Sequence, residues 1–153
     1  MPKISFAIRP LTESDFERVM ELDRINSGSS RRGFFEKRSR AMLENPEVFI
    51  GLAACTEERL VGFVMASILD GEFGGDQRVA VLDALGVAPD HRGQGAGRRL
   101  LGQLVSEVRR CGGHELQTQA QWNQPGLMDF FSSMGFTLAP RLVLERTTKE
   151  ILF

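Results

Sequence analysis

The sequence predicts an α/β fold in which a mixed, largely antiparallel sheet of about six to seven strands is flanked by about four helices. Three observations predict it. Segments with the alternating or continuous apolar pattern of strands are interleaved with segments of helical periodicity. The middle strands are joined by short turns, which favour antiparallel neighbours. Near the C-terminus, a strand, a helix and another strand follow one another.

The predicted elements follow one another along the whole chain, and no linker or repeat divides it. In order they are a strand at 4–10, a helix preceded by the capping-box pattern of Thr12 and Asp15, a helix at 34–45, strands at 47–55, 59–69 and 77–87, a helix from about 95 to 110, a strand at 114–122, a short helix from about 123, and a strand at 141–147. We therefore expect one domain over residues 1–153.

The composition is that of an ordinary globular domain, with 42% hydrophobic and 25% charged residues. A net charge of -1 indicates neither nucleic acid nor an anionic membrane surface as a partner. No apolar run approaches the roughly 20 residues of a membrane span, and no signal peptide is evident. The widely separated Cys55 and Cys111 indicate reduced thiols and a cytoplasmic protein without a metal site. A homodimer is possible, and the sequence leaves the oligomeric state open.

Three glycines fall where the helix that begins near residue 95 has to start. They are Gly93, Gly95 and Gly97 in DHRGQGAGRRLL (90–101). Free backbone N–H groups at a helix start bind anions, and glycines allow a phosphate to approach them closely. The alternative is a glycine-rich surface turn that only caps the helix. The spacing is neither that of a Walker loop nor that of a dinucleotide-binding fingerprint.

Two motifs resemble the GNAT superfamily of N-acetyltransferases. The stretch 92–97 is similar to the family signature Q/R-x-x-G-x-G/A, and Pro89 precedes it as in the family. Downstream, Asn123, an aromatic pair at 130–131 and Gly-Phe at 135–136 resemble a second family feature. The order of elements also matches the family over nearly the whole chain.

The resemblance implies acetyl-CoA (coenzyme A) as cofactor and transfer of its acetyl group to a primary amine of a small molecule or peptide, in a ternary complex. It implies that the fourth and fifth strands splay apart and that pantetheine lies between them. The pyrophosphate would then lie on the backbone of residues 92–97. The cofactor contacts it implies come from Leu85, Gly86, Val87, Arg92, Gly93, Gln94, Gly95, Ala96, Gly97, Arg98, Asn123, Phe130 and Phe131.

Phe131 departs from the family pattern, because many members carry at this position a tyrosine that protonates the departing thiolate. The chain contains no tyrosine at all. Three alternatives follow: Ser132, Ser133 or a water donates the proton; the thiolate leaves unprotonated, which its ordinary pKa allows; or the chain binds acyl-CoA without rapid turnover. The last alternative describes a binding or sensing module. A generic interaction domain without cofactor is a further possibility.

Asp83 and Glu72 are the candidate general bases. Asp83 interrupts an apolar strand, where a carboxylate is costly unless it is paired. By strand alternation it shares a face with Val79, Val81, Leu85 and Val87. It is either a base whose pKa is raised by burial or the structural partner of an arginine. Glu72 lies in an acidic loop, which is either solvated or part of the acceptor pocket.

The family builds its acceptor pocket from the segment between the first two helices. Arg31 and Arg32 lie in that segment of this chain. These arginines either recognise a carboxylate of the acceptor or are simply solvated.

Overall fold

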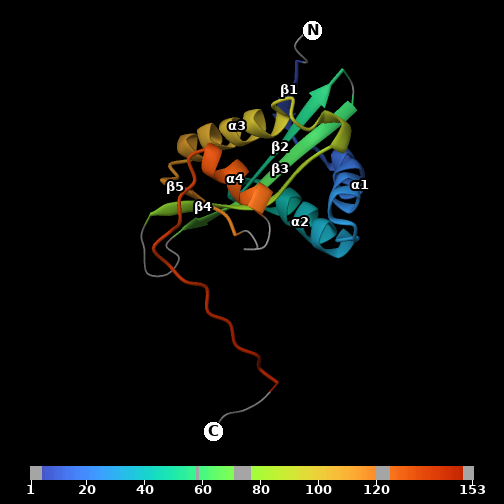
Figure 1. Cartoon of the computed structure of the whole chain (residues 1–153). Coiled ribbons are helices and arrows are strands. Elements are labelled where there is room, and N and C mark those ends of the chain that lie inside the picture. Colours follow the sequence, from blue (N-terminus) through green and yellow to red (C-terminus); the bar gives the residue numbers. More distant parts are fainter. Residues whose placement is uncertain (1–4, 58, 71–76, 120–124, 150–153) are drawn as a thin grey trace. The chain divides into compact units, whose positions relative to one another are not determined.

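The computed structural model describes residues 5–57, 59–70, 77–119 and 125–149. The chain divides into an N-terminal unit, Met1–Gln119, and a C-terminal unit, Ala120–Phe153. Among the residues described, the N-terminal unit holds the sheet and three α-helices, and the C-terminal unit holds one α-helix (Figure 1). Each unit is described by itself below.

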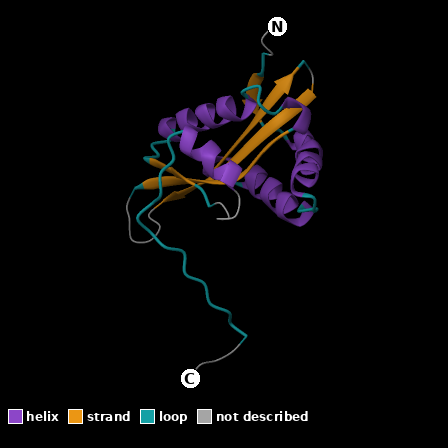
Figure 2. Ribbon diagram, viewed as in Figure 1, coloured by secondary structure: helices purple, strands orange, loops and turns teal. Residues whose placement is uncertain are grey.

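The N-terminal unit is built on a five-stranded sheet (Figure 2). Its strands are β1 (Ala7–Pro10), β2 (Phe49–Thr56), β3 (Arg59–Asp70), β4 (Arg78–Val87) and β5 (Glu115–Gln117), in that spatial order. The first four strands pair antiparallel, whereas β5 runs parallel to β4. The helix α3 (Ala96–Arg110) joins β4 to β5, because parallel neighbours need a crossover connection. The antiparallel meander predicted from the sequence is confirmed, and β4, α3 and β5 form a strand–helix–strand unit.

Helices cover both faces of the sheet. The position of a Cβ on Gly62 would lie 3.1 Å from Leu100 of α3. The next residue, Phe63, packs edge-on against Phe35 of α2 (Arg32–Glu44), with ring centroids 6.0 Å apart. Successive strand residues point to opposite faces, so α3 lies on one face and α2 on the other. Asn26 of α1 (Phe16–Ser27) lies 3.4 Å from the Cβ position of Gly86, on the face of α2.

The α3 helix buries the apolar stripe that its periodicity predicts. Leu100, Leu101 and Leu104 are 0% exposed and Val108 is 4% exposed. Val105, another apolar residue of this helix, is 37% exposed. Burying the four side chains contributes roughly 1.5–3 kcal/mol each, and this packing holds the start of α3 against the sheet.

The prediction of six to seven strands is wrong for the described residues, which contain five. Residues 141–147 form no strand, and the side chains of Leu142 and Leu144 are 88% exposed. An apolar strand-forming pattern becomes a strand only where a neighbouring strand accepts its hydrogen bonds. β5 is also shorter than predicted, and its pairing with β4 is limited to Val79–Val81. The splay between the fourth and fifth strands stays a prediction.

The C-terminal unit contains α4 (Pro125–Ser133), close to where a short helix was predicted. The ring of Phe131 lies 5.6 Å from that of Phe130 and 5.0 Å from that of Phe136, centroid to centroid. The chain turns after the helix at Gly135, whose φ of +89° favours glycine. Phe131 is therefore part of a small aromatic cluster within this unit.

Candidate functional site

The glycine loop connects β4 to α3 through a single turn of 3-10 helix at Pro89–His91. Gly93 and Gly95 have φ angles of +78° and +92°, in the left-handed region that side chains disfavour. A Cβ on either glycine would meet nothing within 4 Å. The backbone conformation therefore requires both glycines, and the space beside them is free of the protein's own described atoms.

Gly97 differs from the other two glycines because its backbone is helical and its φ is not positive. Conformational freedom therefore does not account for it, and glycine at this position lowers helix stability relative to alanine. The first helical hydrogen bond here runs from the Arg99 N–H to the Gly95 carbonyl (3.0 Å). The N–H groups of Ala96 and Gly97 precede it and have no partner within the helix. A glycine here leaves these donors accessible to an anion.

The strand β4 presents backbone groups on the side away from β3. Ala88 donates its N–H to the Val61 carbonyl (2.8 Å). Hydrogen-bonded and outward-facing residues alternate along an antiparallel pair. The N–H and C=O groups of Leu85 and Val87 therefore point away from β3, beyond the three residue pairs that join β4 to β5. The Val87 carbonyl already accepts a hydrogen bond from Nδ2 of Asn26 (3.1 Å), and its second lone pair can accept another. Leu85 and Val87 are the residues that the resemblance assigns to pantetheine.

Gly86 lies between these two residues, and its backbone groups are directed toward β3. A Cβ at this position would lie 2.7 Å from the ring of Phe63, too close for any side chain without a shift. The register thus gives Gly86 a packing role, and its assignment to the cofactor stays a prediction.

The start of α3 is electropositive. No acidic residue lies in the first turn of the helix, whose dipole adds positive potential there. The Arg92 guanidinium donates to the side-chain oxygen of Asn26 (2.5 Å). The guanidinium of Arg99 donates to the Phe6 carbonyl. Both partners are neutral, so the positive charges of these two arginines are not cancelled by them. Such a potential suits a polyanion such as a pyrophosphate.

Asp83 forms a β-bulge in β4. Ala84 pairs with Met65 and Leu82 pairs with Ala66, which leaves Asp83 with no residue opposite it. A bulge inserts one residue and reverses the alternation of the side chains that follow it. Bulges also re-aim side chains and are frequent next to active sites.

The bulge corrects the predicted face of Asp83. Val81 pairs with Ser67, and Asp83 lies within reach of both Ser67 and Arg38 of α2, so Val79, Val81 and Asp83 share the face covered by α2. Beyond the bulge, Leu85 pairs with Val64, on the opposite face. The expectation that Leu85 and Val87 share the face of Asp83 is therefore wrong, because simple alternation does not take account of an inserted residue.

The Asp83 carboxylate has an arginine partner, but a distant one. Its Oδ1 lies 3.6 Å from Nη2 of Arg38, and the two side chains are 11% and 34% exposed. Burial raises the pKa of Asp83 above its ordinary value, while the charge of Arg38 and a hydrogen bond with Ser67 act in the opposite direction. The sequence singled out Asp83 and missed Arg38, because 45 positions separate the partners and no local pattern links them.

The remaining predicted site residues lie elsewhere. Glu72 and Asn123 fall outside the described residues. Phe130 and Phe131 belong to the C-terminal unit described above. In that unit, the Ser133 hydroxyl donates to the Phe130 carbonyl (2.7 Å).

Arg31 and Arg32 both have carboxylate partners. Arg31 donates two hydrogen bonds to the buried Asp23 (2.9 and 2.5 Å). Its guanidinium also lies 5.2 Å from the ring centroid of Phe34, a cation–π distance. Arg32 forms an ion pair with Glu17 (3.0 Å) on the surface. Both arginines thus already bind carboxylates of the protein itself.

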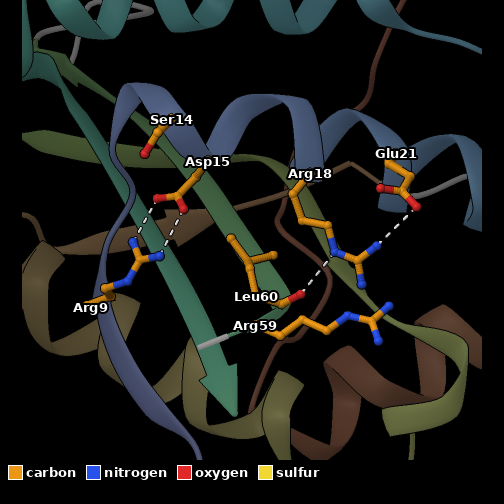
Figure 3. A pocket seen from close by; sticks show the side chains of 7 residues that line it. All are labelled: Arg9, Ser14, Asp15, Arg18, Glu21, Arg59 and Leu60. Atoms are coloured by element: carbon orange, nitrogen blue, oxygen red, sulfur yellow. Dashed lines mark hydrogen bonds and ion pairs between the residues drawn. The ribbon is translucent and has the colours of Figure 1, made fainter. Parts of the chain in front are cut away.

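A shallow polar pocket of about 460 Å³ lies where the start of α1 meets β1 and β3 (Figure 3). It is lined by Arg9, Ser14, Asp15, Arg18, Glu21, Arg59 and Leu60. Arg18 links two sides of the pocket. The Nε of Arg18 donates a hydrogen bond to the Leu60 carbonyl of β3 (3.2 Å), and its Nη1 forms an ion pair with Glu21 of α1 (3.2 Å). Several of the polar side chains thus bind the protein itself. None of the lining residues belongs to the glycine loop.

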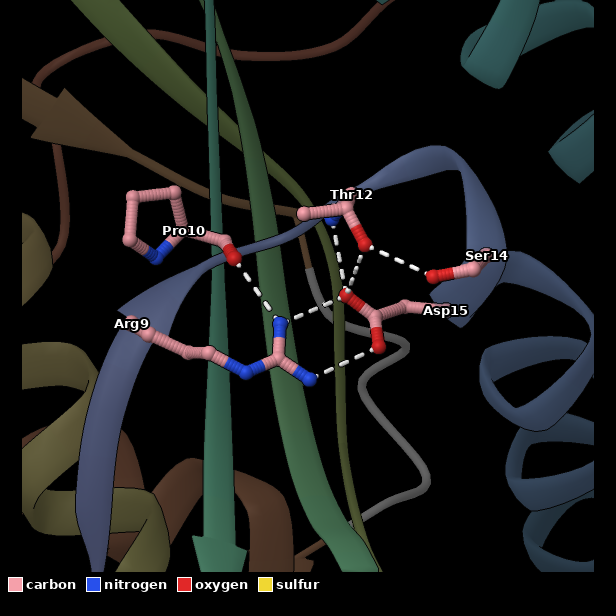
Figure 4. Close-up of polar contacts among 5 residues, drawn as sticks. All are labelled: Arg9, Pro10, Thr12, Ser14 and Asp15. Atoms are coloured by element: carbon pink, nitrogen blue, oxygen red, sulfur yellow. Dashed lines mark hydrogen bonds and ion pairs between the residues drawn. The ribbon is translucent and has the colours of Figure 1, made fainter. Parts of the chain in front are cut away.

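Asp15 is the centre of a hydrogen-bond network at this pocket (Figure 4). Its carboxylate accepts two hydrogen bonds from the Arg9 guanidinium (2.7 and 2.8 Å). It also accepts one from the Thr12 N–H (2.7 Å), which confirms the predicted capping box. Hydrogen bonding to Arg9 is the main cause that lowers the pKa of Asp15 from 3.8 to about 2, against the opposing effect of burial.

The Asp15 network should make stability depend on pH. Because the folded-state pKa is below the ordinary value, its contribution is present above pH 3.8 and is lost as the pH falls to about 2. We expect Asp15→Asn to lower the free energy of unfolding at neutral pH by about 1 to 2 kcal/mol, a figure reduced for the exposure of Arg9. Urea unfolding of the wild-type protein and the variant, from neutral pH down to a pH of about 2, measures the difference between their free energies of unfolding. This difference should shrink as the pH falls.

The matched control is Arg32→Gln, which breaks the two ion pairs of Arg32 with Glu17 and Glu36 on the open surface. Its effect should be smaller than that of Asp15→Asn and less dependent on pH. Equal losses for the two variants would contradict a special role for the buried network.

The described residues hold neither a group of acidic, histidine and cysteine side chains able to bind a metal nor a helix long and apolar enough to span a membrane. Cys55 and Cys111 are both free thiols.

Curated relatives match the chain over a short stretch. The L-methionine sulfoximine/L-methionine sulfone acetyltransferase of Salmonella typhimurium is 34% identical over 65 residues, which are 42% of this chain and 38% of that protein. The L-amino acid N-acyltransferase MnaT of Escherichia coli K12 is 34% identical over 56 residues, 37% of this chain and 33% of that protein. The matches thus span about a third of the length of each relative.

A solved structure and a family model cover much more of the chain. AAC(6')-Iy, in complex with the bisubstrate analog CoA-S-monomethyl-acetylneamine, superimposes with a TM-score of 0.80 over 94% of this chain and 98% of its own. At 19% identity, this likeness shows the fold alone. The model of the acetyltransferase (GNAT) family matches residues 10–136, most of the chain, including the glycine loop and the bulged strand. The chain therefore belongs to the GNAT family of acetyltransferases.

Proposed function

We propose that this protein is an N-acetyltransferase that moves an acetyl group from acetyl-CoA to a primary amine by direct attack in a ternary complex. The observation that carries the proposal is the junction of β4 and α3. There the outward backbone groups of Leu85 and Val87 are followed, a few residues later, by the glycine loop and the free N–H groups of a helix start. Together they provide amide partners for pantetheine and a site for its pyrophosphate.

The residues present fit this cofactor. Gly93 and Gly95 of the loop have positive φ angles and open space beside them, and no acidic side chain lies in the first turn of α3. Arg92 is the first residue of the loop motif, and its neutral partner Asn26 leaves its charge in place. Acetyl-CoA would supply the thioester whose carbonyl carbon the amine attacks, with a thiolate as leaving group.

Asp83 is the proposed general base. An amine attacks only as its free base, so a proton must move to a group with a suitable pKa. Burial raises the pKa of Asp83, which makes the carboxylate a better proton acceptor than an exposed aspartate. The bulge sets its side chain on the face covered by α2, and a water would carry the proton from the amine. Glu72 is the second candidate.

Amino acids are the first acceptors to test, with aminoglycosides second. Both curated relatives are named for transfer to an amino acid or its analogue, and the structural neighbour AAC(6')-Iy is named an aminoglycoside N-acetyltransferase. The acidic character of Asp83 suits a cationic amine in either class.

Phe131 supports a second candidate function, a module that binds acyl-CoA without rapid turnover. Its ring packs against Phe130 and Phe136 and has no proton to donate to a thiolate. Ser133 already donates its hydroxyl to the Phe130 carbonyl, which leaves Ser132, a water or unaided departure as the simplest routes.

One assay distinguishes these functions. Thiol release from acetyl-CoA is followed over a panel of amino acids, aminoglycosides and peptides, and each product is checked by mass for one added acetyl group. Acceptor-dependent release supports the transferase. Binding of CoA by calorimetry without any release would support the sensing module, and failure to bind CoA would contradict both.

A further inference from the structure

Asn26, at the end of α1, joins two parts of the proposed cofactor site that are distant in the sequence. Its side-chain Nδ2 donates a hydrogen bond to the Val87 carbonyl (3.1 Å) at the end of β4. Its Oδ1 accepts one from Nη2 of Arg92 (2.5 Å), the first residue of the glycine-loop motif. The side-chain amide of Asn26 therefore connects the end of β4 to the start of the glycine loop. The sequence did not single out this residue.

The partner of Arg92 is a neutral side-chain amide, whereas several other arginines of the N-terminal unit pair with carboxylates. Examples are Arg9 with Asp15, Arg31 with Asp23 and Arg78 with Asp70. A carboxylate partner would cancel the charge of Arg92, whereas an amide orients the guanidinium and leaves its charge intact. An uncancelled guanidinium attracts a phosphate far more strongly than an ion pair does.

We propose that Asn26 is a positioning residue for the cofactor: it orients Arg92 toward the pyrophosphate and holds the end of β4 beside the loop without neutralising the arginine. This inference rests on the proposed function, because it assumes that CoA binds at residues 92–97. It adds a residue of α1 to a site otherwise built from β4, α3 and the loop between them.

The test uses two variants of the full chain and calorimetry with CoA as the probe. Asn26→Ala removes both hydrogen bonds and leaves the charge of Arg92, so we expect affinity to fall by about threefold. Asn26→Asp preserves the shape but gives Arg92 a carboxylate partner and removes the donor to Val87. We expect it to weaken binding by about tenfold, which corresponds to about 1.4 kcal/mol.

Salt distinguishes this electrostatic role from a merely structural one. The difference in CoA affinity between Asn26→Asp and Asn26→Ala should become smaller as the salt concentration rises from about 0.05 M to about 0.5 M, because salt screens exposed charges. Asn45→Asp is the matched control: it makes the same change of charge at the exposed C-terminal end of α2 and should leave CoA affinity unchanged.

Each outcome decides one point. Wild-type affinity in the folded Asn26→Asp variant would overturn the role of Asn26, as would equal losses in both variants at every salt concentration. Either result would leave the proposed function intact, since the wild-type protein would still bind CoA. Failure of the wild-type protein to bind CoA would overturn the proposed function and, with it, this inference.

Discussion

Replacing Asp83 by asparagine should lower kcat/KM for the amine acceptor by about a hundredfold and remove the acidic limb of the pH–rate profile. The asparagine keeps the size of the side chain and its capacity to hydrogen-bond Ser67, but it cannot accept a proton. CoA affinity should stay unchanged, because Asp83 lies on the face covered by α2, opposite to Leu85 beyond the bulge. Steady-state kinetics over a pH series, with CoA calorimetry on the same protein, measures both quantities.

Arg38→Gln is the companion variant, because it removes the charge that lowers the pKa of Asp83 while the carboxylate stays in place. If Asp83 is the base, the acidic limb should move to higher pH in this variant, with the maximal rate largely kept. If Asp83 serves only as the structural partner of Arg38, both variants should instead lose stability and keep normal turnover. That result would assign Asp83 to the scaffold and make Glu72 the next candidate base.

Replacing Gly97 by valine should weaken CoA binding by about tenfold or more, on the order of 1.4 kcal/mol. The branched side chain would be added in the first turn of α3, next to the N–H groups of Ala96 and Gly97, where the pyrophosphate is proposed to lie. The helix itself should tolerate the change, because valine disfavours helices no more than glycine does. Calorimetry with CoA measures the affinity, and thermal unfolding checks that the variant is folded.

Gly102→Val provides the matched control. Gly102 lies in the same helix, is exposed, and a Cβ there would meet nothing within 4 Å. This variant should bind CoA with wild-type affinity. The same substitution at Gly95 would be harder to interpret, since its φ of +92° strains any side chain even without a ligand. Unchanged affinity in a folded Gly97→Val variant would contradict the proposed pyrophosphate site.

Most secondary structure of the N-terminal unit could be predicted from the sequence, because its signals act over a few residues. The continuous apolar runs of β2 and β3, the period of two in β4 and the helical period of α3 follow directly from where apolar side chains fall. The capping box of Thr12 and Asp15 and the turn at Gly93 and Gly95 depend on local backbone geometry alone. The amino-acid sequence alone was therefore enough to locate the glycine loop and to identify the strand and the helix that flank it.

The predictions that were wrong depended on interactions across the chain. Residues 141–147 carry a strand pattern, but pairing requires a neighbour with free hydrogen-bonding groups, and no residue within the segment specifies one. The predicted face of Asp83 was wrong because a bulge arises from the pairing register of two strands, here residues 65–66 of β3 against 82–84 of β4. Periodicity within one strand does not contain that information.

The sequence by itself determined the order of the elements, the glycine loop at a helix start and the candidate carboxylate in β4. Only the tertiary structure decided which side chains surround them. It brought Arg38 to Asp83 and set Asn26 between Val87 and Arg92, across 61 and 66 positions of chain. The physical reason is that charge, burial and hydrogen bonding depend on distance in space, and folding creates those distances by packing α1 and α2 against the sheet.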